Sequence, residues 1–362
     1  MRSFLSGSLS AALVMITSAS ANSVPAPATE GNRYLNLALN GKACGVVQIA
    51  LYPDTQTIIG SIVPINQLTP ENPRSTLEGI LYRHGDGPWL RAPISDQVGA
   101  HSLIRLPSGR WLMNDGAHGR MVEVDDLSGA GKVISKYELG GIALQYPHDQ
   151  IVDPKTGYIY VIDLGRLFRF KDLEGPVDIW SFTPEQLVYS RSLAWFDDHL
   201  HIINTSRGEV MRIDDFDKRL LTVFKSPRPH IEGVTVATPF GDVDSGALST
   251  TGLVLDSVVK SDDGWYYGSN DFSQAYAMGG DPRPARLIRW RSWEDFAHGN
   301  WQDLSAYIPA SDVPLFPYKL MIHNDILYAG VVSRDIVPKT GQYASPCGYE
   351  TIMMLDLHAI GR

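Results

Sequence analysis

The feature that most restricts the fold of this chain is a recurring unit of strand, tight turn and strand. The clearest copy starts at His148 and ends at Asp163, with two β-rich apolar runs on either side of an Asp-Pro-Lys-Thr-Gly turn. Five such units are countable, spaced by 43 to 65 residues, and they begin at His101, His148, Arg191, Asp256 and Tyr318. A period of roughly 40 to 50 residues in strand-turn-strand units is typical of a β-propeller. We therefore predict an all-β fold with a single propeller.

The number of blades and the closure of the ring follow from the remaining segments. We predict five blades, with six as the alternative, because residues 77–82 have the pattern of a further strand. An N-terminal strand closes a propeller by completing its last blade, and residues 44–52 have a suitable composition to lie beside residues 350–357. That placement brings Cys44 near Cys347, and an even cysteine count in an oxidising compartment favours a disulfide between them.

Smaller elements are also predicted. Four of the five hairpins are followed by a run suited to a third strand, at residues 166–170, 209–214, 286–290 and 351–356. Helical signals are few: Ser292 opens a capping-box pattern and Pro184 lies at the start of a second short pattern, so we expect two short helices there.

The first residues are expected to direct export. Arg2 provides a positive start, residues 9–16 are apolar, and Ala19-Ser20-Ala21 is a small-residue cleavage site. We predict a signal peptide over residues 1–21, a flexible leader over 22–33 and one propeller domain over 34–362. The protein is then secreted or periplasmic, and no later apolar run reaches the roughly 20 residues of a membrane span.

Charge restricts the partners. The 362-residue chain has 31 basic and 40 acidic side chains, a formal net charge of −9, and no cluster of Lys and Arg. This balance argues against nucleic acid as a partner. We expect a small-molecule or oligosaccharide substrate.

One unit resembles a known family. Residues 147–163 followed by Arg166-Leu-Phe-Arg-Phe170 are similar to an NHL-type repeat, and more broadly to the propellers of the gluconolactonase and strictosidine-synthase-like group. The likeness extends in part over residues 98–357. It implies the architecture and carries little information on activity, because one fold hosts many functions.

The repeat places chemically active residues at equivalent positions. The first strand of a propeller blade lines the central channel, so superimposing the units presents one residue from each to a common axis. A ring of ionisable groups carries a desolvation cost unless solvent or a ligand satisfies it. The five residues at this position are His101, His148, Arg191, Asp256 and Tyr318.

This set suits acid-base chemistry on an anionic substrate, and our first hypothesis is a carbohydrate-type lyase. Arg191 would grip the carboxylate of a sugar acid, His101 or His148 would be the base, and Tyr318 the acid. Further substrate contacts are expected from the flanking residues Lys319, Tyr146 and Tyr189. No cofactor is needed for this reaction.

A divalent metal is the basis of a second hypothesis, a hydrolase acting on a lactone or ester. His101, His148 and Asp256 would bind Zn²⁺ or Ca²⁺ if they converge, with His230 as a further histidine. Peptidyl-amidoglycolate lyases are similar in placing histidines of NHL-type blades on zinc, whereas gluconolactonase-type enzymes use Glu, Asn and Asp. The counterparts of that second set are Glu78 or Glu232, Asn204 and Asp256.

A third hypothesis is a propeller that binds a ligand or a protein without turnover. In that case Arg191 pairs with Asp256 as a structural ion pair inside the channel. Eight tryptophans and sixteen tyrosines suit either saccharide stacking or a protein interface, so composition does not decide.

Overall fold

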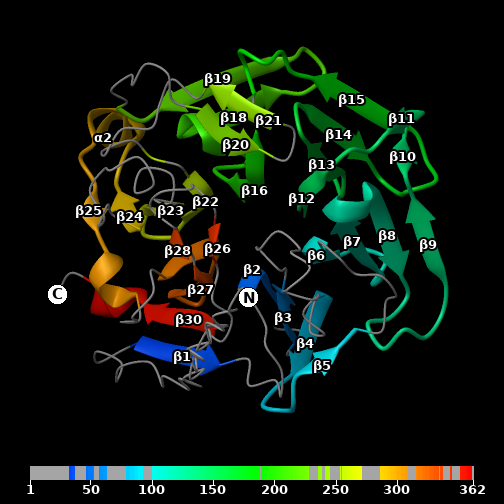
Figure 1. Ribbon diagram of the computed structural model, residues 1–362, viewed down its shortest axis with the longest axis horizontal. Coiled ribbons are helices and arrows are strands. Elements are labelled where there is room, and N and C mark those ends of the chain that lie inside the picture. The colour runs from blue at the N-terminus through cyan, green and yellow to red at the C-terminus, as the bar shows by residue number, and fades with distance from the viewer. Residues whose placement is uncertain are drawn as a thin grey trace, which may run out of the picture.

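Six four-stranded antiparallel sheets surround a common centre in a computed structural model of the protein (Figure 1). The structure describes residues 32–36, 46–52, 57–62, 79–92, 100–187, 189–227, 235–238, 241–244, 253, 255–270, 286–308, 315–333, 335–336, 343–344 and 351–360. The sequence predicted five blades with six as the alternative, and the six sheets correspond to six blades. The additional blade contains residues 79–84, which overlap the run 77–82 that suggested a further strand.

In five of the sheets, consecutive strands lie side by side. They comprise β2 (Val46–Tyr52), β3 (Thr57–Ile62), β4 (Gly79–His84) and β5 (Leu90–Arg91); β6 (Ala100–Arg105), β7 (Trp111–Asp115), β8 (Arg120–Val124) and β9 (Val133–Lys136); and β12 (Pro147–Val152), β13 (Ile159–Asp163), β14 (Arg166–Phe170) and β15 (Val177–Ser181). The other two comprise β16 (Ser190–Phe196), β17 (His199–Asn204), β18 (Glu209–Asp215) and β19 (Leu220–Lys225); and β22 (Leu255–Lys260), β23 (Tyr266–Asn270), β24 (Leu287–Trp290) and β25 (Gln302–Asp303).

The sixth sheet closes the ring. It contains β26 (Leu315–His323), β27 (Ile326–Ser333) and β30 (Thr351–Asp356), with β1 (Asn32–Asn36) as its fourth strand. β1 pairs antiparallel with β30, from Asn32 opposite Leu355 to Asn36 opposite Thr351. Figure 1 shows the two ends of the colour scale meeting there. Closure by an N-terminal strand is therefore confirmed.

The closing strand is not the one that the sequence suggested. Residues 46–52 form β2, the innermost strand of the first blade, and β1 takes the closing role. The reason is burial, because five of the seven residues of β2 are buried and an apolar strand of this kind suits the centre of the ring. Cys44 and Cys347 lie outside the described residues, so the disulfide stays a prediction.

The remaining elements are short. Three two-stranded hairpins join the ring: β10 (Glu138–Leu139) with β11 (Ile142–Ala143), β20 (Thr235–Thr238) with β21 (Gly241–Asp244), and β28 (Asp335–Ile336) with β29 (Tyr343–Ala344). The predicted helix after Ser292 is confirmed as α2 (Trp293–His298), and the Ser292 hydroxyl accepts the Asp295 amide at 3.0 Å. At Pro184 the chain forms only a turn, so the second predicted helix is wrong.

Both faces of each sheet pack on neighbouring sheets. Seven apolar clusters lie in the described part of the chain, and six of them fill the spaces between adjacent blades, one in each. The seventh is smaller and groups Val47, Phe316, Tyr318 and Val332. This packing explains the continuous apolar runs of the sequence, because a strand covered on both faces does not need to alternate. The innermost strands contact one another in the order β2, β6, β12, β16, β22, β26 and back to β2, and so form the channel wall.

One of the inter-blade cores contains a buried histidine whose protonation opposes folding. His201 stacks on Phe196 with ring centroids 3.7 Å apart, and burial lowers the pKa of His201 to about 3. The unfolded chain takes up this proton near pH 6.5 while the folded protein does not, so stability falls as the pH drops from 6.5 towards 3. Between pH 7 and 5 we expect His201 to account for a loss of about 2 kcal/mol.

Urea denaturation at the two pH values measures this loss. The His201→Gln variant should lose less stability than the wild type over the same interval, by about 2 kcal/mol. His358, whose side chain is exposed, gives the control variant His358→Gln. Equal losses in wild type and His201→Gln would contradict the assignment.

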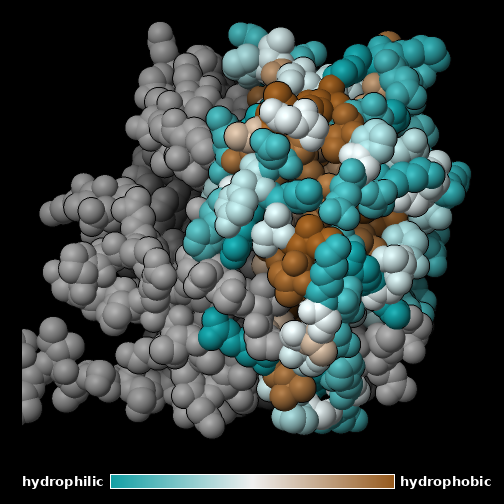
Figure 2. Space-filling model, turned by 90° about the vertical axis from the view of Figure 1, so that its right-hand side faces the viewer, coloured by the Kyte–Doolittle hydropathy of each residue, from teal (hydrophilic) through white to brown (hydrophobic). Residues whose placement is uncertain are grey.

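The outer surface of the ring is mixed in character. Seen from the side that carries β9, β10 and β11, hydrophobic patches lie among hydrophilic residues (Figure 2). Val133 and Ile142 are among the exposed large apolar side chains. Among the described residues there is no helix with the length and hydrophobicity that crossing a bilayer requires.

Candidate active site at one end of the channel

A β-bulge recurs near the start of every innermost strand. In β6, β12, β16 and β22 the pairing register shifts by one residue, and the extra residues are His101, His148, Arg191 and Asp256. In β26 the shift spans Tyr318 and Lys319, and in β2 the extra residue is Val47. Bulges re-aim side chains and are frequent beside active sites. The five residues that the repeat aligned therefore occupy equivalent positions around one axis.

Four of these residues and two tyrosines make one group, which we call the bulge cluster: His148, Arg191, Asp256, Tyr318, Tyr146 and Tyr189. The His148 ring lies 5.5 Å from Tyr189, edge to face, and 5.7 Å from Tyr146. The Arg191 guanidinium carbon lies 5.7 Å from the centre of the Tyr189 ring and 5.4 Å from that of Tyr318. Contact with two aromatic rings limits the orientations that this guanidinium can adopt.

Arg191 and Asp256 form an ion pair between neighbouring blades. Nη1 of Arg191 donates to Oδ1 of Asp256, whose side chain is fully buried. The structural pair that the sequence left open is therefore present. This ion pair holds the guanidinium, whose side chain is 14% exposed, at the level of the bulges.

The tautomer of His148 follows from its hydrogen bond. Nδ1 of His148 lies 2.8 Å from the carbonyl oxygen of Arg191, and a carbonyl only accepts, so Nδ1 carries the proton. Nε2 is then the basic nitrogen. Beside it, burial and the neighbouring Tyr189 raise the pKa of Tyr146, so the Tyr146 phenol stays protonated at neutral pH.

Residues at the ends of the second strands hold the cluster in place. The Asp163 carboxylate accepts the backbone N–H of Tyr146 at 2.6 Å, and the Thr205 hydroxyl accepts that of Arg191 at 3.1 Å. The Ser269 hydroxyl donates to the carbonyl of Tyr318 at 3.0 Å. These bonds fix the backbone on which three of the functional side chains stand.

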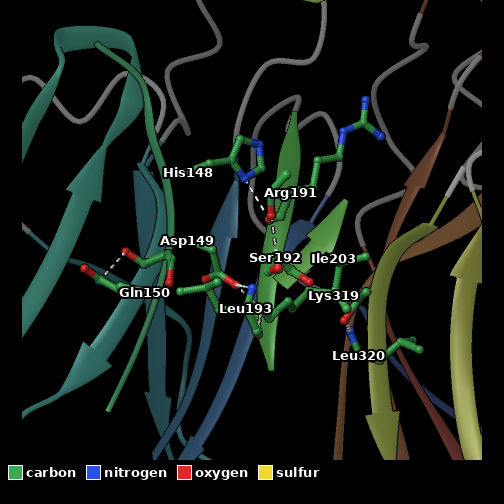
Figure 3. A network of polar contacts seen from close by, with 12 residues as sticks. His148, Asp149, Gln150, Arg191, Ser192, Leu193, Ile203, Lys319 and Leu320 are labelled. Atoms are coloured by element: carbon green, nitrogen blue, oxygen red, sulfur yellow. Dashed lines mark hydrogen bonds and ion pairs between the residues drawn. The ribbon is translucent and has the colours of Figure 1, made fainter. Parts of the chain in front are cut away.

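Lys319, predicted to contact substrate, does not join the bulge cluster. Its ammonium donates to Oδ2 of Asp149, which also accepts the Leu193 amide at 2.7 Å. β26 lies three strands from β12 in either direction around the ring, so this ion pair crosses the axis. Figure 3 shows His148 and Arg191 at one end of the strands, and Asp149 further along. The sequence analysis did not single out Asp149, although this residue directly follows His148, one of the candidate site residues.

The metal hypothesis finds little support among the described residues. They contain no group of three His, Cys, Asp or Glu side chains that could hold a metal ion. The Arg191 cation already contacts the Asp256 carboxylate, and a divalent cation there would face its repulsion, so these residues fit a metal poorly. His101 lies in β6, but its side chain is not among the described ones.

The other ligands considered for a metal are no better placed. Asn204 donates through Nδ2 to the Gln186 carbonyl at 3.1 Å and to Glu209 at 3.0 Å, which commits its amide to the protein. His230, Glu78 and Glu232 lie outside the described residues. The described part of the site therefore contains a histidine, three tyrosines and the Arg191 cation paired with the Asp256 carboxylate.

Comparison with known proteins shows which solved structures share this fold. No protein-family model matches the sequence, and no curated protein matches it. A catalytically inactive virginiamycin B lyase from Staphylococcus aureus, solved with quinupristin, is 13% identical with a TM-score of 0.53 over 90% of this chain and 99% of that chain. A putative gluconolactonase is 13% identical with a TM-score of 0.54 over 91% of this chain and 93% of that chain.

A third similar structure is not described as an enzyme. An auxiliary nutrient binding protein from Bacteroides thetaiotaomicron is 8% identical with a TM-score of 0.53, over 86% of this chain and 69% of that chain. At such identities the likeness concerns the fold, which agrees with the sheet topology. The chain is a β-propeller that resembles the lyase and gluconolactonase-like propellers in architecture.

Proposed function

We propose that the bulge cluster is the active site of a lyase that acts by β-elimination on a carboxylate-bearing substrate, a sugar acid in the first instance. The observation that carries the proposal is the convergence of His148, Arg191 and Tyr318 from three innermost strands. A base, a cation and a phenol are the groups that elimination beside a carboxylate requires.

The reaction assigns one task to each group. Arg191 binds the carboxylate and stabilises the charge that develops on it as the neighbouring C–H bond breaks. Nε2 of His148 takes that proton, a C=C bond forms, and the C–O bond to the leaving group breaks. The Tyr318 phenol gives its proton to the departing oxygen, and exchange with solvent restores both residues. The electron pairs balance without a redox partner.

The test is a screen for an unsaturated product. Purified protein is incubated with oligogalacturonates, and with quinupristin because one neighbour of similar fold is a lyase solved with it. Formation of product is followed by ultraviolet absorbance, with and without EDTA. Unsaturated product that still forms in EDTA supports the proposal, whereas product lost on metal removal and restored by Zn²⁺ or Ca²⁺ would mean that the elimination depends on a metal ion and would contradict the metal-free reaction proposed here.

A conservative variant of the cation tests its role in binding. We expect Arg191→Lys to keep the charge opposite Asp256 but to lose the fork that holds a carboxylate with two bonds. KM should rise by about 10- to 100-fold with a smaller change in kcat, because the lost contact is made in both ground and transition states. Arg219→Lys is the control, since Arg219 bonds to the Ile179 carbonyl in another part of the molecule. An unchanged KM would exclude Arg191 from the substrate site.

Binding without turnover is the second candidate function. The Arg191–Asp256 ion pair favours it, because an arginine already paired inside a channel has a structural role to fill. A nutrient binding protein among the structures of similar fold is consistent with this use of the architecture. An oligogalacturonate that raises the melting temperature but gives no unsaturated product would support this candidate over the lyase.

A further inference from the structure

A second set of equivalent polar residues lies outside the bulge cluster, where the third strands begin. In the second blade (β6–β9), Arg120 begins β8 and lies opposite Asp115, the last residue of β7. In the third blade (β12–β15), Arg166 begins β14 and lies opposite Asp163, the last residue of β13. Nε of Arg120 donates to Asp115 at 2.8 Å, and Nη2 of Arg166 donates to Asp163 at 2.6 Å. Each of these arginines is therefore neutralised by a carboxylate of its own blade.

The fifth blade (β22–β25) has the arginine without the aspartate. Arg286 directly precedes β24, and its carbonyl accepts the backbone N–H of Asn270, the last residue of β23, at 2.9 Å. Asn270 therefore occupies the position of Asp115 and Asp163, and its neutral amide cannot compensate the charge of a guanidinium. Among the described residues, no carboxylate forms an ion pair with Arg286.

The guanidinium of Arg286 has donors to spare. Its side chain is partly buried, and Nη1 donates to the Leu315 carbonyl at 2.5 Å. Nε and Nη2 have no acceptor in the described part of the chain, and neither nitrogen is enclosed by the protein. Two such nitrogens on one edge of a guanidinium match the two oxygens of a carboxylate.

The electrostatics agree with this geometry. Burial lowers the pKa of Arg286, and the Asp303 carboxylate, which makes no ion pair with it, offsets this only in part. Burial alone would also lower the pKa of Arg120, but the bond with Asp115 outweighs it and the pKa is raised. Arg286 thus carries a desolvation cost that an anionic ligand would offset.

Arg286 lies at the same end of the ring as the bulge cluster. The pairing of β22 with β23 shifts register at Asp256, directly beside the pair that contains Asn270. Neighbouring strands lie about 4.8 Å apart, so the backbone of Arg286 is about 10 Å outward from β22. The carbonyl that Arg286 contacts belongs to Leu315, the first residue of β26, and this strand also carries Tyr318.

We infer that Arg286 binds a second carboxylate of the substrate, and that the substrate is therefore an oligomer of acidic sugars and not a single sugar acid. This assignment rests on the proposed function, in which Arg191 binds the carboxylate of the unit that reacts. The two arginines belong to neighbouring blades, so one chain of sugars contacts both. It also gives a reason for Asn270, because an aspartate there would neutralise the cation that the substrate needs.

Galacturonate and trigalacturonate are matched probes, since they carry one carboxylate and three. Their affinities for the full chain are measured by isothermal titration calorimetry in a His148→Ala parent, which prevents turnover. We expect the parent to bind trigalacturonate about 10- to 100-fold more tightly than galacturonate, the value of a hydrogen-bonded contact between charged groups. Arg286→Gln should remove most of this preference and leave the affinity for galacturonate unchanged.

Asn270→Asp is the sharper variant, because it gives the fifth blade the carboxylate that the second and third blades have. It should pair with Arg286 and weaken trigalacturonate binding by a similar factor, while the bond from Arg286 to Leu315 remains. Arg291→Gln is the control and also lowers the net charge by one. Arg291 is exposed beyond the other end of β24 and donates to the Asp263 carbonyl at 2.6 Å. This variant should bind both probes as the parent does.

Three results would overturn the inference while leaving the lyase proposal intact, provided that the wild type still forms unsaturated product. The first is equal weakening of both probes in Arg286→Gln, which would mean that Arg286 only supports the fold through Leu315. The second is unchanged binding of trigalacturonate in Asn270→Asp, and the third is equal affinity of the parent for the two probes.

The opposite separation is also measurable. If the titrations give the expected pattern but the wild type forms no unsaturated product, only the lyase proposal fails. If the parent binds neither probe, the inference is overturned together with the sugar-acid substrate. Should Arg286→Gln fail to fold, Asn270→Asp and its control decide.

Discussion

Lys319→Met is expected to lower the free energy of unfolding by about 3–5 kcal/mol. The ammonium of Lys319 is the cation that pairs with Asp149, whose side chain is 2% exposed. Without it, a buried carboxylate keeps only the Leu193 amide among its described partners. Breaking a buried pair by removing one partner is strongly destabilising because it leaves the other charge uncompensated. Urea denaturation followed by circular dichroism measures the change.

A double variant separates the ion pair from general packing. In Asp149→Asn/Lys319→Met no charge remains, and the amide oxygen still accepts the Leu193 N–H, so much of the lost stability should return. Lys155→Met is the control, because Lys155 and Asp198 form an ion pair with side chains 59% and 68% exposed. Exposed pairs contribute about 0–1 kcal/mol. If Lys319→Met loses no more stability than Lys155→Met, the Lys319–Asp149 ion pair does not stabilise the fold.

His148→Ala is expected to reduce kcat for β-elimination by about 10²- to 10⁴-fold, the usual contribution of a general base. The loss follows from the tautomer, since the Arg191 carbonyl holds the proton on Nδ1 and leaves Nε2 as the base. Initial rates of unsaturated product, measured for wild type and variant at saturating substrate, give the ratio.

The control and a rescue distinguish catalysis from a structural role. His358→Ala removes an exposed histidine and should leave kcat unchanged. Added imidazole should restore part of the activity of His148→Ala, because it supplies a base to the space that the substitution opens. A His148→Ala variant with wild-type kcat would place the chemistry elsewhere in the molecule.

Much of the architecture could be predicted from the sequence because the repeat has a direct physical cause. Each blade needs a hairpin and a further strand, and the predicted third strands at 166–170 and 351–356 coincide with β14 and β30. The equivalence of His148, Arg191 and Asp256 was also predictable, since each is the bulge residue of its innermost strand.

What could not be predicted depends on distances across the ring. Asp149 meets Lys319 over a sequence separation of 170 residues, and no local pattern reports such a contact. The closing strand was misassigned for a related reason. β1 has little apolar character to mark it, whereas the apolar run of β2 suits any buried strand of the ring.

The central claim is that residues from separate blades act together on one substrate, and a double-mutant cycle on kcat/KM tests it most directly. His148 and Tyr318 lie on β12 and β26, which are not adjacent in the ring. If they serve one elimination, His148→Ala/Tyr318→Phe should be about as impaired as the worse single variant. Single effects that multiply in the double variant would mean that the two residues act independently, and the bulge cluster would not be a common active site.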